Sequence, residues 1–324
     1  MNRRSWDVIT FGETMWRLSP PGFGRLEEAV SLDVRMGGSE SNTAIALARL
    51  GLRTSWWSKL PDNPLGHRIE NEVRRWGVDT AAVNWDKKSS ARAGLYFIDF
   101  GTSPRATNVH YDRANSSACT IRPDHVSVDH IENSRLLHLT GITTALSDSC
   151  AEAVSFAIGF AKDAGKLVSF DVNYRAKLWS PDAAKVTLSR ILPKVDLLFC
   201  PESDAKTVFG IEGSAESVAR QLKERFGVPS VVVTCSEGGA RAIDDNGAYS
   251  VSAYPLGQIV DRIGAGDAFS AGTLFGYLSG DLPKGMEYGT AMAALKHTIP
   301  GDILIATRAE IEAVVAGAKG GVSR

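Results

Sequence analysis

Short apolar runs alternate with amphipathic segments along most of the chain. The runs at 8–11, 167–170 and 231–233 are rich in Val, Ile, Leu and Phe and are typical of buried strands. Between such runs, apolar residues recur every three or four positions, and several of these segments stop at a glycine, as helices commonly do. The last of them begins with Thr307 and Glu310 at the spacing of a capping box. The alternation predicts parallel βαβ units and therefore an α/β fold around a mostly parallel sheet.

Two segments, 13–36 and 92–113, lack a helical period. The first contains Pro20-Pro21-Gly22-Phe23-Gly24 between extended runs, and the second alternates like two strands around Gly101-Thr102-Ser103-Pro104. Strands inserted in this way predict a small antiparallel sheet that stands off the main domain, with plain structural hairpins as the alternative. The expected core comprises residues 1–12, 37–91 and 114–324.

Charge and length favour a small-molecule ligand. The 324 residues include 36 Lys and Arg against 37 Asp and Glu, so no net field attracts nucleic acid or an anionic membrane surface. The length suits one large α/β domain with an appendage. The first residues lead into a short apolar strand, so we expect no signal peptide, no membrane span and a cytoplasmic location.

Neither the cysteines nor the histidines show the spacing of a metal site. His125 and His130 lie with Asp124 and Asp129 in a polar stretch that we expect to be solvated surface. The cysteines are scattered without a CxxC pair and are expected to be free thiols. They are Cys119, Cys150, Cys200 and Cys235.

A glycine-rich turn runs directly into a helical segment at 260–269, with the sequence Val-Asp-Arg-Ile-Gly-Ala-Gly-Asp-Ala-Phe. The glycines allow backbone N–H groups to approach an anion, and a helix N-terminus favours negative charge. A phosphoryl group could lie there, with Asp267 beside it to accept a proton from an attacking hydroxyl. Alternatively, Asp267 only caps its helix. The residues of this run alone leave both interpretations open.

The run resembles the Asp-Thr-x-Gly-Ala-Gly-Asp signature of the ribokinase-like (PfkB) carbohydrate kinases, with Arg262 in place of Thr. A second signature of that family, a Gly-Gly pair followed by Asn and small residues, is similar to 37–44, Gly-Gly-Ser-Glu-Ser-Asn-Thr-Ala. The resemblance covers essentially the whole chain. It implies a three-layer αβα core and a small β-sheet lid that closes over the site and excludes water.

Within that family, the stretches 171–175, 300–302 and 306–308 are most similar to 2-keto-3-deoxygluconate kinases. The resemblance implies ATP-dependent phosphorylation of the terminal hydroxyl of 2-keto-3-deoxygluconate to give 2-keto-3-deoxy-6-phosphogluconate. Asp267 would be the general base, and the amides of Gly264, Ala265 and Gly266 would stabilise the transferring group. ATP and Mg²⁺ are the implied cofactors. No protein ligand to the metal is assigned, because phosphates usually hold most of it.

A Tyr and an Arg on one face of a strand could together bind an anionic sugar acid. The period of two places Tyr111 and Arg113 together, where Arg can hold a carboxylate in bidentate fashion, although a solvated strand face is the alternative. Arg175 resembles a second substrate-binding Arg, against the alternative of an internal ion pair with Asp171. The substrate-binding residues implied by the resemblance are Gly37, Gly38, Asn42, Tyr96, Tyr111, Arg113, Arg175 and Asp302.

The segment 233–240 resembles the phosphate loop of the family. Ser236 stands where Gly is usual, and 201–204, Pro-Glu-Ser-Asp, stands where Asn-x-x-Glu is often found, which removes the Asn amide. Asp204 could still act on the metal through water. The nucleotide-binding residues implied are Thr234, Ser236, Gly239, Gly264 and Gly266.

Two other functions stay open at this point. A fructokinase, a ribokinase or a 2-keto-3-deoxygalactonate kinase would use the same machinery, but neutral sugars offer no anion to Arg113 and Arg175. A catalytically inactive sugar-binding regulator would fit the departures at Pro201 and Ser236. An exposed lid edge could pair with another subunit, so we expect a homo-oligomer with sugar acid and ATP as its small-molecule partners.

Overall fold

The computed structural model describes residues 5–317, and an eight-stranded sheet lies at their centre. The six strands from β12 to β4 pair in parallel, whereas β13 and β14 are antiparallel additions at one edge. This confirms the predicted α/β fold with a mostly parallel sheet. In order across the sheet, the strands are β14 (Ala248–Val251), β13 (Ala240–Ile243), β12 (Ser230–Thr234), β11 (Leu197–Pro201), β10 (Leu167–Asp171), β9 (Ser134–Thr140), β1 (Trp6–Phe11) and β4 (Thr54–Trp57).

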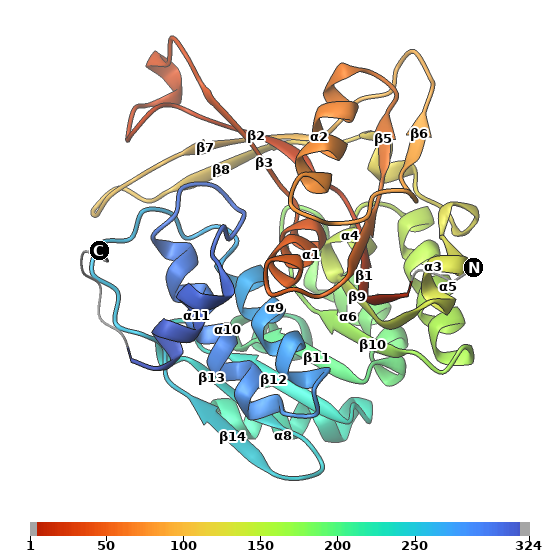
Figure 1. Cartoon of the computed structure of the whole chain (residues 1–324), viewed down its shortest axis with the longest axis vertical. Helices are drawn as coiled ribbons and strands as arrows, with labels where there is room; N and C mark the ends of the chain where they lie inside the picture. Colours follow the sequence, from red (N-terminus) through yellow and green to blue (C-terminus); the bar gives the residue numbers. More distant parts are fainter. Residues whose placement is uncertain (1–4, 318–324) are drawn as a thin grey trace.

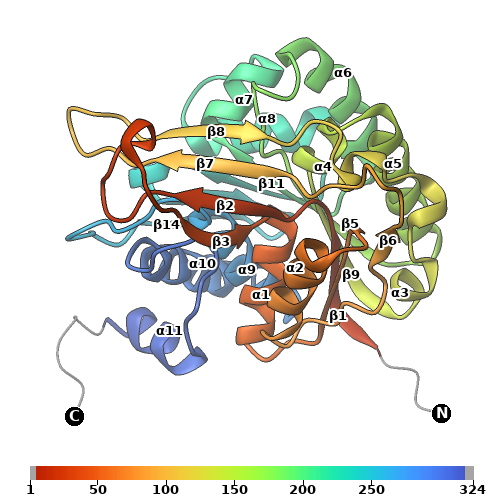
Figure 2. The same cartoon turned by 90° about the horizontal axis from the view of Figure 1, so that it is seen from above.

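Helices cover both faces of this sheet, as Figures 1 and 2 show, and each face has its own apolar core. One face carries α3 (Val128–Glu132), α5 (Asp148–Asp163), α6 (Pro181–Ile191), α7 (Glu202–Phe209) and α8 (Ala215–Phe226). The other carries α1 (Ser39–Arg49), α9 (Ala265–Tyr277), α10 (Leu282–His297) and α11 (Arg308–Val315). Strands buried on both faces need apolar side chains at every position, which explains why they are continuous apolar runs in the sequence.

The lid is a four-stranded sheet in the order β3 (Asp33–Gly37), β2 (Met15–Ser19), β7 (Leu95–Asp99) and β8 (Asn108–Asp112). It extends beside the central sheet in Figure 1. Each inserted segment forms an antiparallel hairpin, but β2 and β7 pair in parallel where the two hairpins meet. The expected lid is therefore present, whereas the expectation of a purely antiparallel sheet was wrong. The alternation within each hairpin carried no information about how distant hairpins pair.

A third apolar core joins the lid to the main domain. The helix α2 (Pro64–Arg74) and the two-stranded sheet of β5 (Lys59–Pro61) and β6 (Asn84–Asp86) pack there. Trp16 and Met36 of the lid contribute to this core, so the base of the lid is fixed.

His130 differs from the expectation of a solvated surface. Its side chain is buried, and its ring stacks on Trp6 with 4.1 Å between centroids. The helix α3 turns this residue toward the first strand, so part of the polar stretch belongs to the core. No helix within residues 5–317 is long and apolar enough to cross a membrane.

Candidate active site

The glycine-rich turn forms the N-terminus of α9. Gly264 is the N-cap residue with a φ of +84°, and a Cβ on it would lie 1.9 Å from the carbonyl oxygen of Asp302. Only glycine fits this position, because both its backbone conformation and its close neighbour exclude a side chain. A Cβ on Gly266 would meet open space instead. The first N–H groups of a helix lack partners within it. Within residues 5–317 the Ala265 amide donates to the Arg262 carbonyl oxygen at 3.4 Å, whereas the Gly264 and Gly266 amides have no backbone partner.

Asp267 lies in the first turn of α9 and faces α1. Its Oδ1 accepts a hydrogen bond of 2.6 Å from the Ser39 hydroxyl, and its Oδ2 accepts one of 2.7 Å from Asn42 Nδ2. Within the described chain this carboxylate accepts no bond from an N–H of its own helix, so the capping alternative fails. Burial raises the pKa of Asp267, while the bonds from Ser39 and Asn42 oppose that rise.

The polar residues that follow β10 join the same cluster. Asn173 Nδ2 donates to Ser39 Oγ at 3.1 Å and to Asp171 Oδ2 at 3.3 Å. Burial raises the pKa of Asp171 to about 8, and the charges of Asp267 and Asp204 add to the rise. No ion pair joins Asp171 to Arg175 in the part of the chain that the structure describes, so the internal-pair alternative is not observed.

Glu40 was not singled out by the sequence analysis. It lies buried beneath the cluster, where its Oε1 accepts hydrogen bonds of 2.7 Å from both Thr140 and Thr143. Its Oε2 has no partner within residues 5–317. Burial raises the pKa of Glu40 to about 7 despite the two threonine bonds. A charged residue within the small-residue run 37–44 was the only signal for it.

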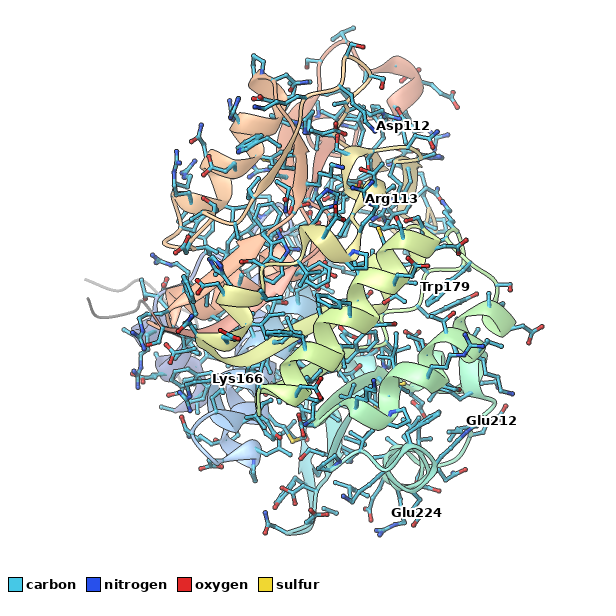
Figure 3. The ribbon with its side chains drawn as sticks, turned by 90° about the vertical axis from the view of Figure 1, so that its right-hand side faces the viewer. Asp112, Arg113, Lys166, Trp179, Glu212 and Glu224 are labelled. Atoms are coloured by element: carbon cyan, nitrogen blue, oxygen red, sulfur yellow. The ribbon has the colours of Figure 1, made fainter. Side chains whose placement is uncertain are left out.

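A cavity of about 520 Å³ lies between the lid and the core, lined by residues that include Tyr111, Arg113 and Arg175. The Arg113 guanidinium lies 5.5 Å from the Tyr111 ring centroid, at the junction of lid and core (Figure 3). Its charge is already paired, because Nη2 lies 2.5 Å from Glu13 Oε2 and both side chains are buried. Arg175 is a guanidinium of this cavity without a direct ion-pair partner within the described residues. Burial raises the pKa of three carboxyl groups, and the charge of Arg175 lowers it, at Asp171, Asp204 and Asp267.

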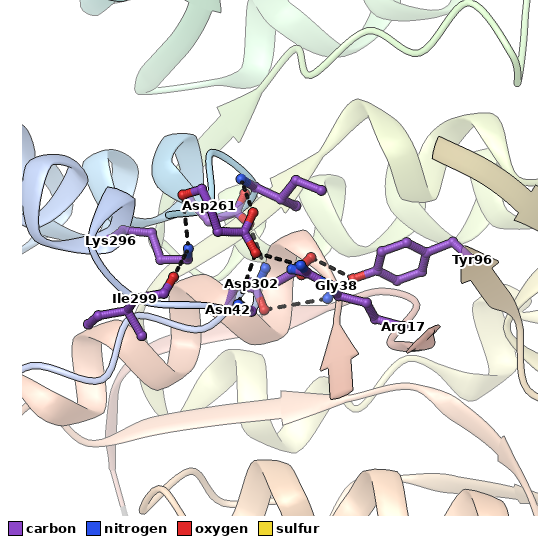
Figure 4. A network of polar contacts seen from close by, with 11 residues as sticks. Arg17, Gly38, Asn42, Tyr96, Asp261, Lys296, Ile299 and Asp302 are labelled. Atoms are coloured by element: carbon purple, nitrogen blue, oxygen red, sulfur yellow. Dashed lines mark hydrogen bonds and ion pairs between the residues drawn. The ribbon is translucent and has the colours of Figure 1, made fainter. Parts of the chain in front are cut away.

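Tyr96 and Asp302 are bonded to each other. The Tyr96 hydroxyl donates to Asp302 Oδ2 at 2.6 Å, and Arg17 bridges Asp302 Oδ1 and Asp261 Oδ2 at 2.5 Å each (Figure 4). A Cβ on Gly37 would lie 2.3 Å from Asp302 Oδ2. This buried network ties two lid strands to the start of the glycine-rich turn. Sequence reasoning missed Arg17, which no local pattern marks, and it gave Asp261 no role although Asp261 opens the signature sequence.

The proposed phosphate loop has left-handed backbone at two positions. Gly239 has a φ of +82°, and a Cβ there would lie 2.1 Å from the Val251 carbonyl oxygen. Ser236 has a φ of +49°, so it keeps a backbone conformation that favours glycine. Thr234 ends β12 directly before the loop. The departure at Ser236 thus changes the side chain without changing the handedness of the turn.

The carboxylate of Asp204 is partly occupied, because its Oδ2 accepts a hydrogen bond of 2.8 Å from the Tyr174 amide. Burial raises the pKa of Asp204. The described residues contain no cluster of three His, Cys, Asp or Glu side chains that could hold a metal. A magnesium ion would fit here only with phosphate oxygens as most of its ligands, with Asp204 positioned to act through water.

A glycine-rich turn at a helix N-terminus with a buried carboxylate in its first turn is an arrangement suited to phosphoryl transfer. The chain belongs to the pfkB family of carbohydrate kinases, whose model matches residues 6–308. It is a sugar-acid kinase of that family, and kinases of the family use ATP with Mg²⁺.

Two curated relatives align over nearly the whole chain. A 2-dehydro-3-deoxygalactonokinase of Haloferax volcanii is 42% identical, with 98% of this chain and 99% of the relative covered. A 2-dehydro-3-deoxygluconokinase of Bacillus subtilis is 30% identical, with 92% and 91% covered. The crystal structure of 2-dehydro-3-deoxygluconokinase from Thermotoga maritima superposes with a TM-score of 0.91 at 32% identity and covers 98% of this chain and 100% of its own.

Proposed function

We propose that this protein transfers the γ-phosphoryl group of ATP to the terminal hydroxyl of a 2-keto-3-deoxy sugar acid. The observation that carries the proposal is the position of Asp267, held by Ser39 and Asn42 beside the glycine-rich turn. The charge of Arg175 is close enough to lower the pKa of the Asp267 carboxyl. The general base and the guanidinium that would bind an anion therefore lie near each other. A carboxylate group on the substrate would pair with Arg175.

The terminal hydroxyl would lose its proton to Asp267 as its oxygen attacks the γ-phosphorus in line, and ADP would leave with the electrons of the broken bond. The raised pKa of Asp267 makes it a stronger base than an exposed carboxylate. Amides of Gly264, Ala265 and Gly266 would stabilise charge on the transferring group. Magnesium would supply charge neutralisation on the triphosphate.

Binding of the sugar acid would use the lid and α1. Tyr111 would cover the carbon chain, while Gly38 and Asn42 would face the hydroxyls. Tyr96 and Asp302 would act as one hydrogen-bonded pair at the lid base, with Gly37 leaving room for them. The nucleotide phosphates would lie between the loop carrying Thr234, Ser236 and Gly239 and the turn at Gly264 and Gly266. These assignments extend the expectations drawn from the sequence.

Two epimers are candidates for the substrate. The sequence favours 2-keto-3-deoxygluconate, whereas the relative with 42% identity is named for 2-dehydro-3-deoxygalactonate and the relative with 30% for the gluconate epimer. The epimers differ at a single hydroxyl, and Arg175 would recognise the carboxylate that both share. We therefore propose activity on this class of acid and expect the galactonate epimer to be accepted.

The test is a coupled assay for ADP release with both epimers, fructose and ribose, each with ATP and magnesium. The proposal expects kcat/KM for at least one keto-acid to exceed that for either neutral sugar by at least tenfold. A preference for fructose or ribose would overturn the substrate class. Absence of phosphoryl transfer to every acceptor would favour a sugar-binding regulator instead.

A further inference from the structure

Lys296 is a fully buried cation near the end of α10. Its side chain is 0% exposed, and its Nζ donates to the carbonyl oxygens of Ile299 at 2.9 Å and Asp261 at 3.4 Å (Figure 4). Within residues 5–317, no carboxylate oxygen lies within the 4.0 Å ion-pair distance of this ammonium. A buried charge with only carbonyl partners is costly, so its presence calls for a role.

The two carbonyls belong to the segments that shape the phosphoryl site. Asp261 opens the glycine-rich turn, and its carboxylate accepts hydrogen bonds from the amides of Ile263 at 3.0 Å and Gly301 at 2.9 Å. Ile299 opens the loop that carries Asp302, whose carbonyl oxygen packs against Gly264. The ammonium thus lies where the turn and the loop meet.

Two carboxylates lie close enough to offset part of the cost of burying this cation. Burial lowers the pKa of Lys296, and the charges of Asp261 and Asp302 oppose that fall. The positive charge of Arg17 also lowers the pKa of Lys296, but Arg17 itself forms ion pairs with both of those carboxylates. A desolvated ammonium held by carbonyl oxygens carries the same single positive charge as a desolvated monovalent ion such as K⁺ or NH₄⁺ held by such oxygens.

We propose that Lys296 is a positioning residue whose ammonium acts as a tethered monovalent cation, holding the turn at Asp261 and the loop at Ile299 in the geometry that phosphoryl transfer requires. The kinase would therefore work without potassium or ammonium ions. This inference rests on the proposed function for its kinetic consequence, whereas its consequence for ion binding does not depend on the substrate.

Three variants separate the effect of the Lys296 charge from the effect of the volume that its side chain fills. Lys296→Ala removes the charge and leaves room for an ion, Lys296→Met removes the charge but fills the room, and Lys284→Ala removes an exposed lysine from the same helix as a control. Each is assayed in KCl, NH₄Cl, NaCl and tetramethylammonium chloride at one ionic strength. Thermal unfolding is measured in the same salts without substrate.

Wild-type kcat is expected to change less than twofold among the salts. The kcat of the control variant Lys284→Ala is expected to change equally little. Lys296→Ala should lose about 10- to 100-fold in kcat in tetramethylammonium, the range for losing an outer-shell partner, and recover in K⁺ or NH₄⁺. Lys296→Met should lose activity in every salt. Potassium should raise the unfolding temperature of Lys296→Ala more than that of Lys296→Met.

Activation of the wild type by potassium of fivefold or more would overturn the proposal. So would equal loss by Lys296→Ala in all salts together with no ion-specific shift of its unfolding temperature. If the wild type phosphorylates no acceptor, the proposed function fails, and the unfolding measurements still decide whether the alanine variant binds a monovalent ion.

Discussion

Asn42 Nδ2 donates a 2.7 Å hydrogen bond to Asp267 Oδ2, which connects α1 to the first turn of α9 across 225 residues of sequence. With Ser39 on the other oxygen, both carboxylate oxygens are held in place before a substrate arrives, and each keeps a lone pair free. A general base gains from such orientation, because a misplaced acceptor loses much of the advantage of proximity. The helix that follows the Gly-Gly pair and the glycine-rich turn are therefore held together at Asp267.

Replacing Asp267 by Asn should remove the proton acceptor while keeping the shape of the site. We expect kcat to fall by about two to four orders of magnitude, the usual contribution of general base catalysis. ATP affinity, measured by calorimetry, should change little, because the turn amides remain. Asp245→Asn in an exposed loop is the matched control. Near-normal turnover of Asp267→Asn would exclude Asp267 from the mechanism.

Asn42→Ala should act through Asp267. The Asn42 bond lowers the pKa of Asp267, so its loss raises that pKa further. Because the base works deprotonated, the acidic limb of the kcat/KM profile should move to higher pH. A profile measured from pH 5 to 9 checks this. A variant that loses activity equally at all pH values would show that Asn42 affects folding or substrate contacts alone.

The sequence predicted local features better than pairings between distant segments. The turn at 264–267 was predictable, because adjacent glycines and the following helix period mark it without reference to the rest of the chain. The pairing of Arg17 with Asp302 was not, since 285 residues separate them and Arg17 lies in no recognisable pattern. Spacing in the sequence also does not reveal whether a charged side chain already has a partner, as Arg113 shows.

Arg113 was predicted to meet the substrate carboxylate together with Arg175, and that role is still untested. The structure adds that Glu13, 100 residues away, already neutralises the Arg113 guanidinium. No pattern of spacing in the sequence reveals a buried partner at that separation. The contrast between the two arginines gives a direct experiment.

Arg175→Ala should raise KM for the sugar acid by about tenfold or more with little loss of stability, because Arg175 makes no ion pair within residues 5–317. Arg113→Ala should instead lower the free energy of unfolding by about 3–5 kcal/mol, since it leaves the buried Glu13 carboxylate unpaired. Kinetics and urea unfolding distinguish the two outcomes. Recovery of stability in Arg113→Ala with Glu13→Gln would identify the unpaired charge as the cause.

Glu40→Gln should stabilise the protein in a pH-dependent way. The folded-state pKa of Glu40 is about 7 against a usual value of 4.5, so the favourable contribution of its neutral form is complete below pH 4.5 and is lost as pH rises through 7. Gln keeps an oxygen for Thr140 and Thr143 and never ionises. Its advantage over Glu should therefore grow from near zero at pH 4.5 to about 3 kcal/mol at pH 8. Unfolding free energies at the two pH values check this, with Glu216→Gln on the surface of α8 as the control. An equal effect of Glu40→Gln at both pH values would show that Glu40 does not titrate between them in the folded state.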